Sequence, residues 1–183
     1  MRKCKNPECR KKYDPTKPLQ TACSVHCALV IASISMEKKA KKQAVEERKE
    51  IRKKKMDVKP LSFFAKQAQA SFNAYVRERD KDEHCISCQR FHDGQYHAGH
   101  YFTVGAHPEL RFNEDNCHKQ CSVCNNHMSG NIEQYTPNLI LKIGEDRFNA
   151  LKEFKKLPKL KRDDYEKIRD EYKKKLKELK AKQ

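Results

Sequence analysis

The chain has 183 residues, and 41 Lys and Arg residues against 25 Asp and Glu residues give it a formal charge of +16 at pH 7. A mean hydropathy of −1.04, with no Trp, 8 Phe and 7 Tyr, excludes a membrane protein and an enzyme with an ordinary large apolar core. The longest apolar stretch, residues 28–36, is far shorter than the ~20 residues of a spanning helix. No export signal precedes it, so we expect a cytoplasmic protein.

The positive charge lies outside the middle of the chain. Residues 1–82 carry 22 basic and 10 acidic side chains (+12), residues 83–131 carry 3 and 5 (−2), and residues 132–183 carry 16 and 10 (+6). Clustered Lys and Arg side chains gain affinity for polyanions because they release counterions from phosphate backbones. The pattern predicts basic arms that bind nucleic acid around a central segment that carries the chemistry.

Spaced cysteine pairs begin at the N-terminus. The chain has nine cysteines, and without an export signal metal-thiolate sites are a better interpretation than disulfides. The first four follow the pattern C-x4-C-x13-C-x3-C: Cys4, Cys9, Cys23 and Cys27. Four thiolates around zinc can stabilise a domain too small to fold by its apolar core. We expect a zinc ribbon over residues 1–27, with His26 as an alternative to Cys27; a flexible tail with scattered thiols is the other interpretation.

Residues 28–58 contain neither Gly nor Pro and are rich in Ala, Lys, Glu and Arg, which predicts one long exposed helix. Apolar residues become sparse after Met36, so the second half is poorly amphipathic. Two interpretations stay open, a solvated linker helix and an arm that contacts DNA phosphates. The candidate contacts for the second are Lys41, Lys42, Arg48, Lys49, Arg52 and Lys53.

Further helices are predicted on both sides of the central segment. One covers residues 63–79, with Ser62 as its cap and an apolar stripe that should be core: Phe64, Ala68, Phe72, Tyr75 and Val76. The others cover residues 139–143 after Pro137, residues 145–157 with Phe148, Leu151 and Phe154 on one side, and residues 162–180. The apolar stripe of the last helix suits packing within the chain or pairing with a second subunit.

Two C-x2-C pairs separated by 32 residues mark the central segment: Cys85, Cys88, Cys121 and Cys124. Four thiolates from two tight turns predict a closed structural zinc site. Such a site leaves no ligand position for water, so its role is to hold distant stretches of chain together. We interpret Cys117, the ninth cysteine, as a small buried thiol, and His118 as a structural residue or an alternative zinc ligand.

The residues between and after these pairs carry candidate chemistry. Residues 94–102 (GQYHAGHYF) suit the first strand of a hairpin, and residues 110–116 (LRFNEDN) lead into the second cysteine pair. The stretch NNHMSGN directly after Cys124 is expected to open a helix. A zinc clip would therefore hold a strand-borne His100 against a helix-borne Asn125.

This layout resembles the zinc-containing HNH, or His-Me finger, endonucleases, in particular the endonuclease VII type that resolves branched DNA. The stretches AGHY, ELRFNEDNCHKQC and CNNHMSGN are closer still to the phage NinG family of recombination proteins, also called Rap. The resemblance covers residues 83–135 firmly and the N-terminal cysteines more loosely.

The resemblance implies that His100 is the general base that removes a proton from the attacking water, a role suited to an imidazole that is mostly neutral at pH 7. It implies that Asn116 ties the hairpin loop and helps to orient the histidine. It also implies that Asn125 is a ligand of a catalytic Mg²⁺ or Mn²⁺ ion, which would polarise the scissile phosphate.

Gly99 departs from the family pattern. In many HNH enzymes an Asp directly before the base binds the metal, and Gly99 offers no side chain for that purpose. Asp93, His97 or His127 are the candidates for the missing ligand, and Asn131 is a further oxygen donor. If the segment is extended, His97 and His100 point to opposite faces because they are three residues apart.

We expect an α+β fold, mainly helical, with a small zinc-stapled ββα (His-Me finger) core, long basic helices and an N-terminal zinc ribbon. The expected divisions are 1–27 (zinc ribbon), 28–58 (basic helix), 59–157 (finger with flanking helices) and 158–183 (C-terminal basic helix). The resemblance implies a phage endonuclease that cuts branched recombination intermediates such as Holliday junctions. Symmetric cutting needs two active sites, so a homodimer is expected. A non-catalytic zinc-finger DNA-binding or recombination accessory protein and a nonspecific nicking nuclease stay open as alternatives.

Overall fold

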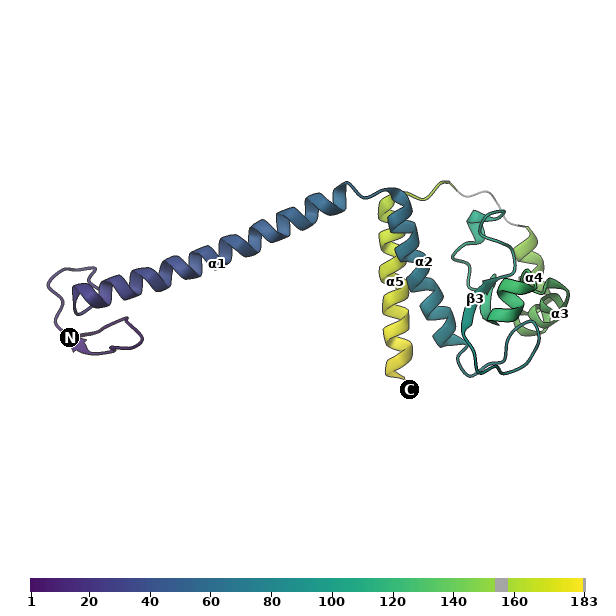
Figure 1. Cartoon of the computed structure of the whole chain (residues 1–183), viewed down its shortest axis with the longest axis horizontal. Coiled ribbons are helices and arrows are strands. Elements are labelled where there is room, and N and C mark those ends of the chain that lie inside the picture. Colours follow the sequence, from purple (N-terminus) through teal and green to yellow (C-terminus); the bar gives the residue numbers. More distant parts are fainter. Residues whose placement is uncertain (154–157, 183) are drawn as a thin grey trace. The chain divides into compact units, whose positions relative to one another are not determined.

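The computed structural model describes residues 1–153 and 158–182. The chain divides into two compact units, residues 1–59 and 60–183, which are described separately (Figure 1). The division lies one residue beyond the boundary expected after residue 58. The C-terminal helix, expected as a separate division from residue 158, belongs to the second unit.

A small cysteine-rich turn begins the first unit. Strands β1 (Arg2–Lys3) and β2 (Lys12–Tyr13) pair in antiparallel fashion. Cys4, Ala22 and Cys27 form a buried cluster beside them. With so few apolar residues in this cluster, the four cysteines are the main groups that can hold the turn together.

One long helix, α1 (Val25–Asp57), makes up the rest of the first unit (Figure 1). It starts three residues before the predicted residue 28, because the Ser24 hydroxyl accepts a hydrogen bond from the Cys27 amide and caps the first turn. Apart from a few residues in its first turns and Met56 in its last turn, the helix is exposed. The expectation of one long, exposed, charged helix is confirmed.

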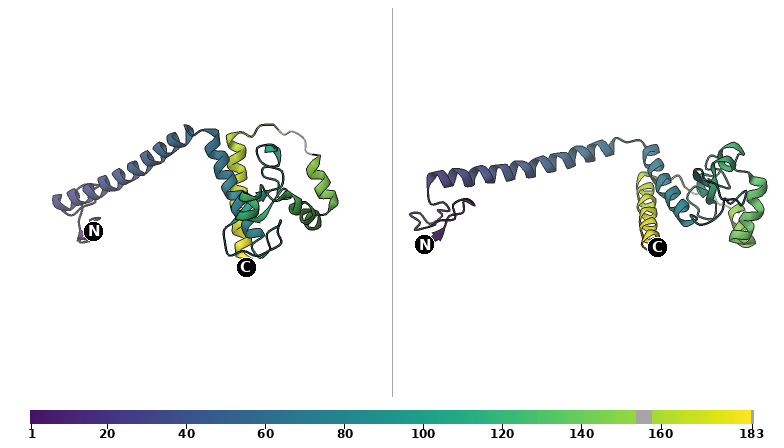
Figure 2. Two further views of the ribbon diagram at one scale, coloured as in Figure 1. Left: turned by 45° about the vertical axis from the view of Figure 1, so that its right-hand side comes forward. Right: turned by 60° about the horizontal axis from the view of Figure 1, so that its bottom comes forward.

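Helices α2 (Leu61–Arg79) and α5 (Arg162–Ala181) lie side by side in the second unit (Figures 1 and 2). The contact is aromatic, and the rings of Phe72 and Tyr172 meet edge to face with centroids 4.8 Å apart. The predicted core stripe of α2 is confirmed, with Tyr75 half-buried and its other members buried. The predicted Ser62 cap is wrong: the extended residue Pro60 precedes the helix, and Ser62 is an exposed residue within its first turn.

A two-stranded hairpin carries the central segment. Strands β3 (Tyr96–His100) and β4 (Cys117–Cys121) are antiparallel, with His100 opposite Cys117. One face of the hairpin packs on the aromatic cluster of α2 and α5 through Ala98. On the other face, the Tyr135 hydroxyl of helix α3 (Ile132–Ile143) donates to the Gly99 carbonyl at 3.0 Å. The hairpin therefore has a face toward α2 and a face toward α3.

The short elements that complete the unit are the 3₁₀ turn Pro108–Leu110, the π-helical turn η2 (Val123–His127) and helix α4 (Glu145–Lys152). The helix predicted over residues 139–143 is longer than expected, since α3 begins at Ile132 and contains Pro137. That proline is tolerated because the carbonyl left without a partner belongs to exposed Glu133. Residues 154–157, including the predicted Phe154, lie outside the described residues.

A second apolar core lies between α3 and α4, built from Ile86, Leu110, Tyr135, Leu139, Ile143, Phe148 and Leu151. The fold is thus mainly helical, as expected, and the described residues form two small sheets. Within the described residues, none of the helices is long and apolar enough to cross a membrane.

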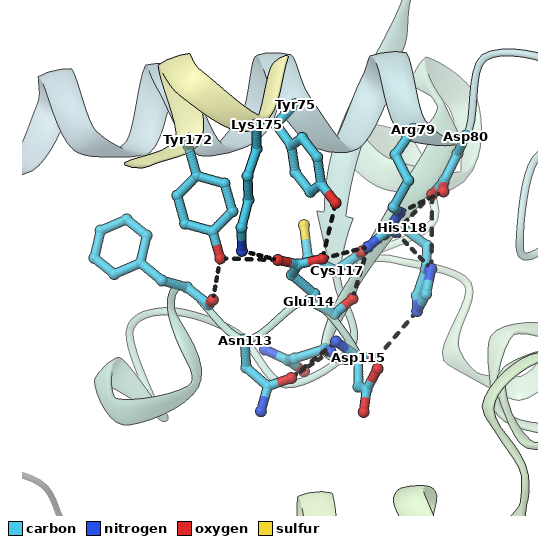
Figure 3. A network of polar contacts seen from close by, with 12 residues as sticks. Tyr75, Arg79, Asp80, Asn113, Glu114, Asp115, Cys117, His118, Tyr172 and Lys175 are labelled. Carbon is cyan, nitrogen blue, oxygen red and sulfur yellow. Dashed lines mark hydrogen bonds and ion pairs between the residues drawn. The ribbon is translucent and has the colours of Figure 1, made fainter. Parts of the chain in front are cut away.

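A buried polar network joins the end of α2 to the hairpin (Figure 3). Asp80 is 1% exposed; Arg79 donates to its carboxylate at 2.6 and 2.8 Å, and the Lys119 amide donates at 3.0 Å. Arg79 also lies 3.0 Å from His118 Nδ1, which must accept because a guanidinium can only donate. His118 Nε2 then donates to the Asp115 carbonyl at 3.1 Å. His118 is therefore a structural residue, and the alternative of a zinc ligand is wrong.

The charge of Asp80 should be a main source of stability in the second unit. Burial by itself would raise the pKa of Asp80, but hydrogen bonds from Arg79 and the nearby positive charges of Arg79 and Lys142 hold that pKa well below its usual range. Because the pKa of Asp80 is lower in the folded chain than its ordinary value of about 3.9, the carboxylate stabilises the fold fully at pH values above about 3.9. This contribution is lost as the pH falls through the pKa of the folded state.

We expect Asp80→Asn to lower the free energy of unfolding by roughly 3–5 kcal/mol at neutral pH, because Arg79 loses its buried partner. Urea unfolding followed by circular dichroism measures the difference. Asp82→Asn, at an exposed position two residues away, is the matched control and should change stability by less than about 0.5 kcal/mol. Equal effects of the two substitutions would contradict the assignment.

Candidate active site

The second cysteine set meets at the base of the hairpin. The sulfur atoms of Cys85, Cys88, Cys121 and Cys124 all lie within 4.8 Å of one another. Backbone amides point at them: the Cys121 amide donates to Cys85 Sγ at 3.3 Å and the Cys124 amide to Cys121 Sγ at 3.4 Å. Amide hydrogen bonds favour the thiolate form that binds metal. These residues could hold a structural zinc ion.

The N-terminal set has the same construction. The sulfur atoms of Cys4, Cys9, Cys23 and Cys27 lie within 4.8 Å of one another, with Cys23 Sγ 3.6 Å from Cys9 Sγ and 3.7 Å from Cys27 Sγ. A tetrahedral zinc with Zn–S bonds of about 2.3 Å places its sulfurs about 3.8 Å apart, so this set also fits zinc.

Cys27 is the member that the first turn of α1 supplies. Hydrogen bonds from Asn6 and Ser24 lower the pKa of Cys27 to about 6 and so favour its thiolate. The neighbouring His26 is exposed and is not part of the set, which rules out the alternative ligand. Consecutive helical residues point about 100° apart, so only one of the two can face the other sulfurs.

We expect Cys88→Ser to abolish zinc binding at the central set and to unfold the hairpin region, since binding energy at a structural zinc is folding energy. Zinc content by atomic absorption should fall from two ions to one per chain, and the second unit should lose its cooperative thermal transition. Replacement of the ninth cysteine, Cys117→Ser, is the control and should leave the zinc content unchanged. Retention of two zinc ions by Cys88→Ser would contradict the assignment.

His100 ends β3 on the face toward α2. Its Nε2 lies 2.9 Å from the Arg111 carbonyl, and because a carbonyl can only accept, Nε2 carries the proton and Nδ1 has the lone pair. Nδ1 lies 3.6 Å from Cys117 Sγ, and the Phe72 ring centroid is 6.0 Å from that of the imidazole. Burial lowers the pKa of His100 below its ordinary value. The side chain is therefore an oriented, neutral imidazole at pH 7.

Asn116 closes the loop between the two strands. It is fully buried, its Oδ1 accepts from the Phe102 amide at 2.8 Å, and its Nδ2 donates to the Phe102 and Leu110 carbonyls at 3.0 and 3.2 Å. Arg111, whose carbonyl orients His100, directly follows Leu110. Asn116 thus ties the hairpin loop and fixes the group that holds the imidazole.

The three residues considered as ligands of a catalytic ion do not lie beside His100. Asn125 is on η2, where its Nδ2 donates to Asn126 Oδ1 at 2.7 Å, and His127 is exposed at the end of the same turn. His97 is on β3 and, from the strand alternation, faces α3, opposite to His100. The strand geometry thus separates His97 from His100, as expected.

The further candidates and Cys117 are also placed. Asp93 is exposed, and the buried Asn131 donates its amide to Cys124 Sγ at 3.6 Å, so it serves the cysteine set. Cys117 is fully buried and burial raises the pKa of its thiol, so the expectation of a small buried thiol is confirmed. The six basic candidates on α1 are all exposed.

Two residues that position the site have no signal in the sequence. The carbonyl of Arg111 orients His100, a backbone role that any residue type could fill. Gln120 is fully buried on β4 and its Oε1 is 2.1 Å from the point where a Cβ at Gly99 would lie. The alternation of β4 shows which residues share a face, but only the folded hairpin shows that Gln120 fills the space above Gly99.

Comparison with known proteins identifies related sequences. The family model described as "Bacteriophage Lambda NinG protein" matches residues 1–182. Protein ninG of Escherichia phage lambda and Protein ninG of Salmonella phage P22 are each 38% identical over 192 residues, covering 97% of this chain and 93% of theirs. Protein ninG of Enterobacteria phage H19B is 48% identical over 101 residues, 55% of this chain and 50% of that protein. No solved structure matches significantly.

Proposed function

Because this chain belongs to the NinG family of phage lambda, we propose that it is a metal-dependent endonuclease that hydrolyses phosphodiester bonds in branched DNA such as Holliday junctions. The observation that carries the proposal is His100, a neutral imidazole held by the Arg111 carbonyl at the end of a hairpin whose base has four converging cysteines. The choice of branched DNA rests on the resemblance to recombination endonucleases.

His100 acts as the general base in this mechanism. Its Nδ1 lone pair takes the proton from the attacking water, and the imidazolium that forms keeps its Nε2 hydrogen bond to the Arg111 carbonyl. The lowered pKa keeps the base neutral at pH 7. Cys117 does not compete for this role, because its buried thiol stays protonated and is a weak donor to Nδ1.

A divalent ion would polarise the scissile phosphate and stabilise the departing 3′ oxygen. Of the three ligands considered, His97 fits such an ion best, since its Nε2 is buried and has no partner among the described residues. Asn125 and His127 lie on turn η2 and would be its further ligands.

Helix α1 would supply the DNA affinity. It carries 10 basic and 5 acidic residues, a net charge of +5, whereas α5 carries 8 and 6, a net charge of +2. Three of the lysines on α5 pair with carboxylates, while among those on α1 a pairing is recorded for Lys49 with Glu46. Paired cuts in a four-way junction need two sites, so the working form is a homodimer.

A non-catalytic DNA-binding protein is the second candidate. It is favoured by Gly99, which offers no carboxylate before His100, and by the position of the His100 ring against Phe72 and Cys117. Both candidates predict DNA binding, and only the first predicts cleavage that depends on His100.

We expect the zinc-loaded protein to cut a four-way junction in the presence of Mg²⁺ or Mn²⁺, faster than a linear duplex of the same sequence. His100→Ala should reduce the single-turnover rate by about 10²-fold or more, the usual contribution of a general base. His84→Ala, at an exposed histidine, is the matched control and should cut normally. Binding of junctions without cleavage, or equal cleavage by His100→Ala, would favour the second candidate.

We expect neutralisation of Lys41, Arg48 and Arg52 to Gln to weaken DNA binding and to flatten its salt dependence. If all three contact phosphates, the slope of log affinity against log salt should become shallower by about 2.7, at about 0.9 per contact. Fluorescence anisotropy at several salt concentrations measures the slope. The control replaces three exposed lysines of α5, Lys173, Lys174 and Lys177, by Gln. If both triple variants change the salt slope equally, α1 does not contact phosphates specifically, and its role would be in spacing or dimerisation.

A further inference from the structure

Two buried polar atoms on one face of the hairpin have no hydrogen-bond partner within residues 1–153 and 158–182: His97 Nε2 and Gln120 Oε1. The two residues are directly opposite each other in the register of β3 and β4. Opposed residues of an antiparallel pair place their side chains on the same face. Both atoms therefore lie on the face toward α3, where buried polar atoms would normally be paired.

The orientation of the Gln120 amide is fixed by its neighbours. Its Nε2 donates to the Ser87 hydroxyl at 2.6 Å and also to the Gly130 carbonyl, which can only accept. Ser87 in turn donates to the same carbonyl at 3.1 Å, so its proton is already used. Turning the amide over would place oxygen against oxygen at Gly130. The unpaired oxygen of Gln120 must consequently face away from Gly130.

Gly99 makes room for that oxygen. A Cβ at Gly99 would lie 2.1 Å from Gln120 Oε1 and 3.0 Å from Gln120 Cβ, so a side chain at Gly99 cannot coexist with Gln120 in this position. The Gly99 carbonyl is occupied by the Tyr135 hydroxyl and does not pair with the amide. The buried acceptor oxygen of Gln120, on β4, thus lies in the space beside Gly99.

We propose that His97 and Gln120 bind a divalent cation on this face of the hairpin. An imidazole nitrogen and an amide oxygen are neutral ligands, and together they suit an ion such as Mn²⁺ that accepts both donor types. That the ion serves phosphodiester hydrolysis rests on the proposed function, but its binding does not require any cleavage.

The test is Mn²⁺ binding to the zinc-loaded full chain, measured from the loss of the electron paramagnetic resonance signal of free Mn²⁺. We expect one ion per chain. Gln120→Met removes the amide oxygen and His97→Phe removes the ring nitrogen, and each should weaken binding at least about tenfold. Gln95→Met and His84→Phe, the same exchanges at exposed residues, should leave affinity unchanged.

A rescue experiment separates ligation from folding. Gly99→Ala should weaken Mn²⁺ binding because its Cβ displaces Gln120 Oε1, whereas Gly99→Asp combined with Gln120→Ser puts a carboxylate into the vacated space and should restore it. Zinc content and the unfolding midpoint report whether each variant is folded. If Gln120→Met unfolds through loss of its bonds to Ser87 and Gly130, His97→Phe decides, because His97 Nε2 makes no hydrogen bond to lose.

Unchanged affinity in folded Gln120→Met or His97→Phe, or no Mn²⁺ bound by the unsubstituted chain, would overturn the site and leave a bound water as the partner of these atoms. The result is independent of the nuclease proposal. Mn²⁺ bound as expected with no DNA cut would reject the proposed function and keep the site. If Gln120→Met cuts DNA normally and keeps the Mn²⁺ affinity of the unsubstituted chain, the site is rejected and the proposed function is kept.

Discussion

The convergence of four sulfur atoms from two distant stretches of chain is the constraint on which the second unit depends. Cys85 and Cys88 precede the hairpin, and Cys121 and Cys124 end its second strand and enter η2. Two strands of five residues are marginal by themselves in water. A metal held by these sulfurs would fix the register of the hairpin, and with it the position of every polar side chain that the strands carry.

Alternate residues of the hairpin strands point to opposite faces, so the hairpin carries different polar groups on each face. On the face toward α2, His100 is oriented through a chain of contacts that runs from Asn116 to the loop and the Arg111 carbonyl. On the face toward α3, His97 and Gln120 leave a nitrogen and an oxygen without a partner in the part of the chain that the structure describes. In the proposed mechanism His100 supplies the base, while the unpaired atoms of the second face supply a proposed cation site whose binding does not depend on cleavage.

The two units divide charge and packing between them. The first unit buries little more than its cysteine cluster and exposes a long basic helix, so it has few contacts by which to fold without metal. The second unit has two apolar cores and a buried ionic network around Asp80, and its excess positive charge is smaller. This division fits the proposed function, in which helix α1 supplies the affinity for DNA and the hairpin supplies the chemistry.

The sequence by itself determined the two cysteine sets, the long exposed helix, the apolar stripe of α2 and the mainly helical class. Each of these features follows from the spacing of nearby residues, because helical periodicity and the geometry of metal ligands relate that spacing directly to structure. The sequence also predicted that His97 and His100 point apart, because that follows from strand alternation alone. The start of α3 was missed because burial of Tyr135 and Leu139 outweighs the local preference of Pro137.

Only the tertiary structure decided what surrounds the histidines. The Arg111 carbonyl, the Asp80 network and the Gln120 oxygen beside Gly99 reach their partners across 11 to 39 residues of chain. Such contacts depend on backbone atoms and on the packing of separate elements, which no local pattern records. The spacing of the cysteines could therefore indicate the ligands of a metal. The environment that keeps an imidazole neutral, or leaves an amide oxygen unpaired among the described residues, exists only once the chain has folded.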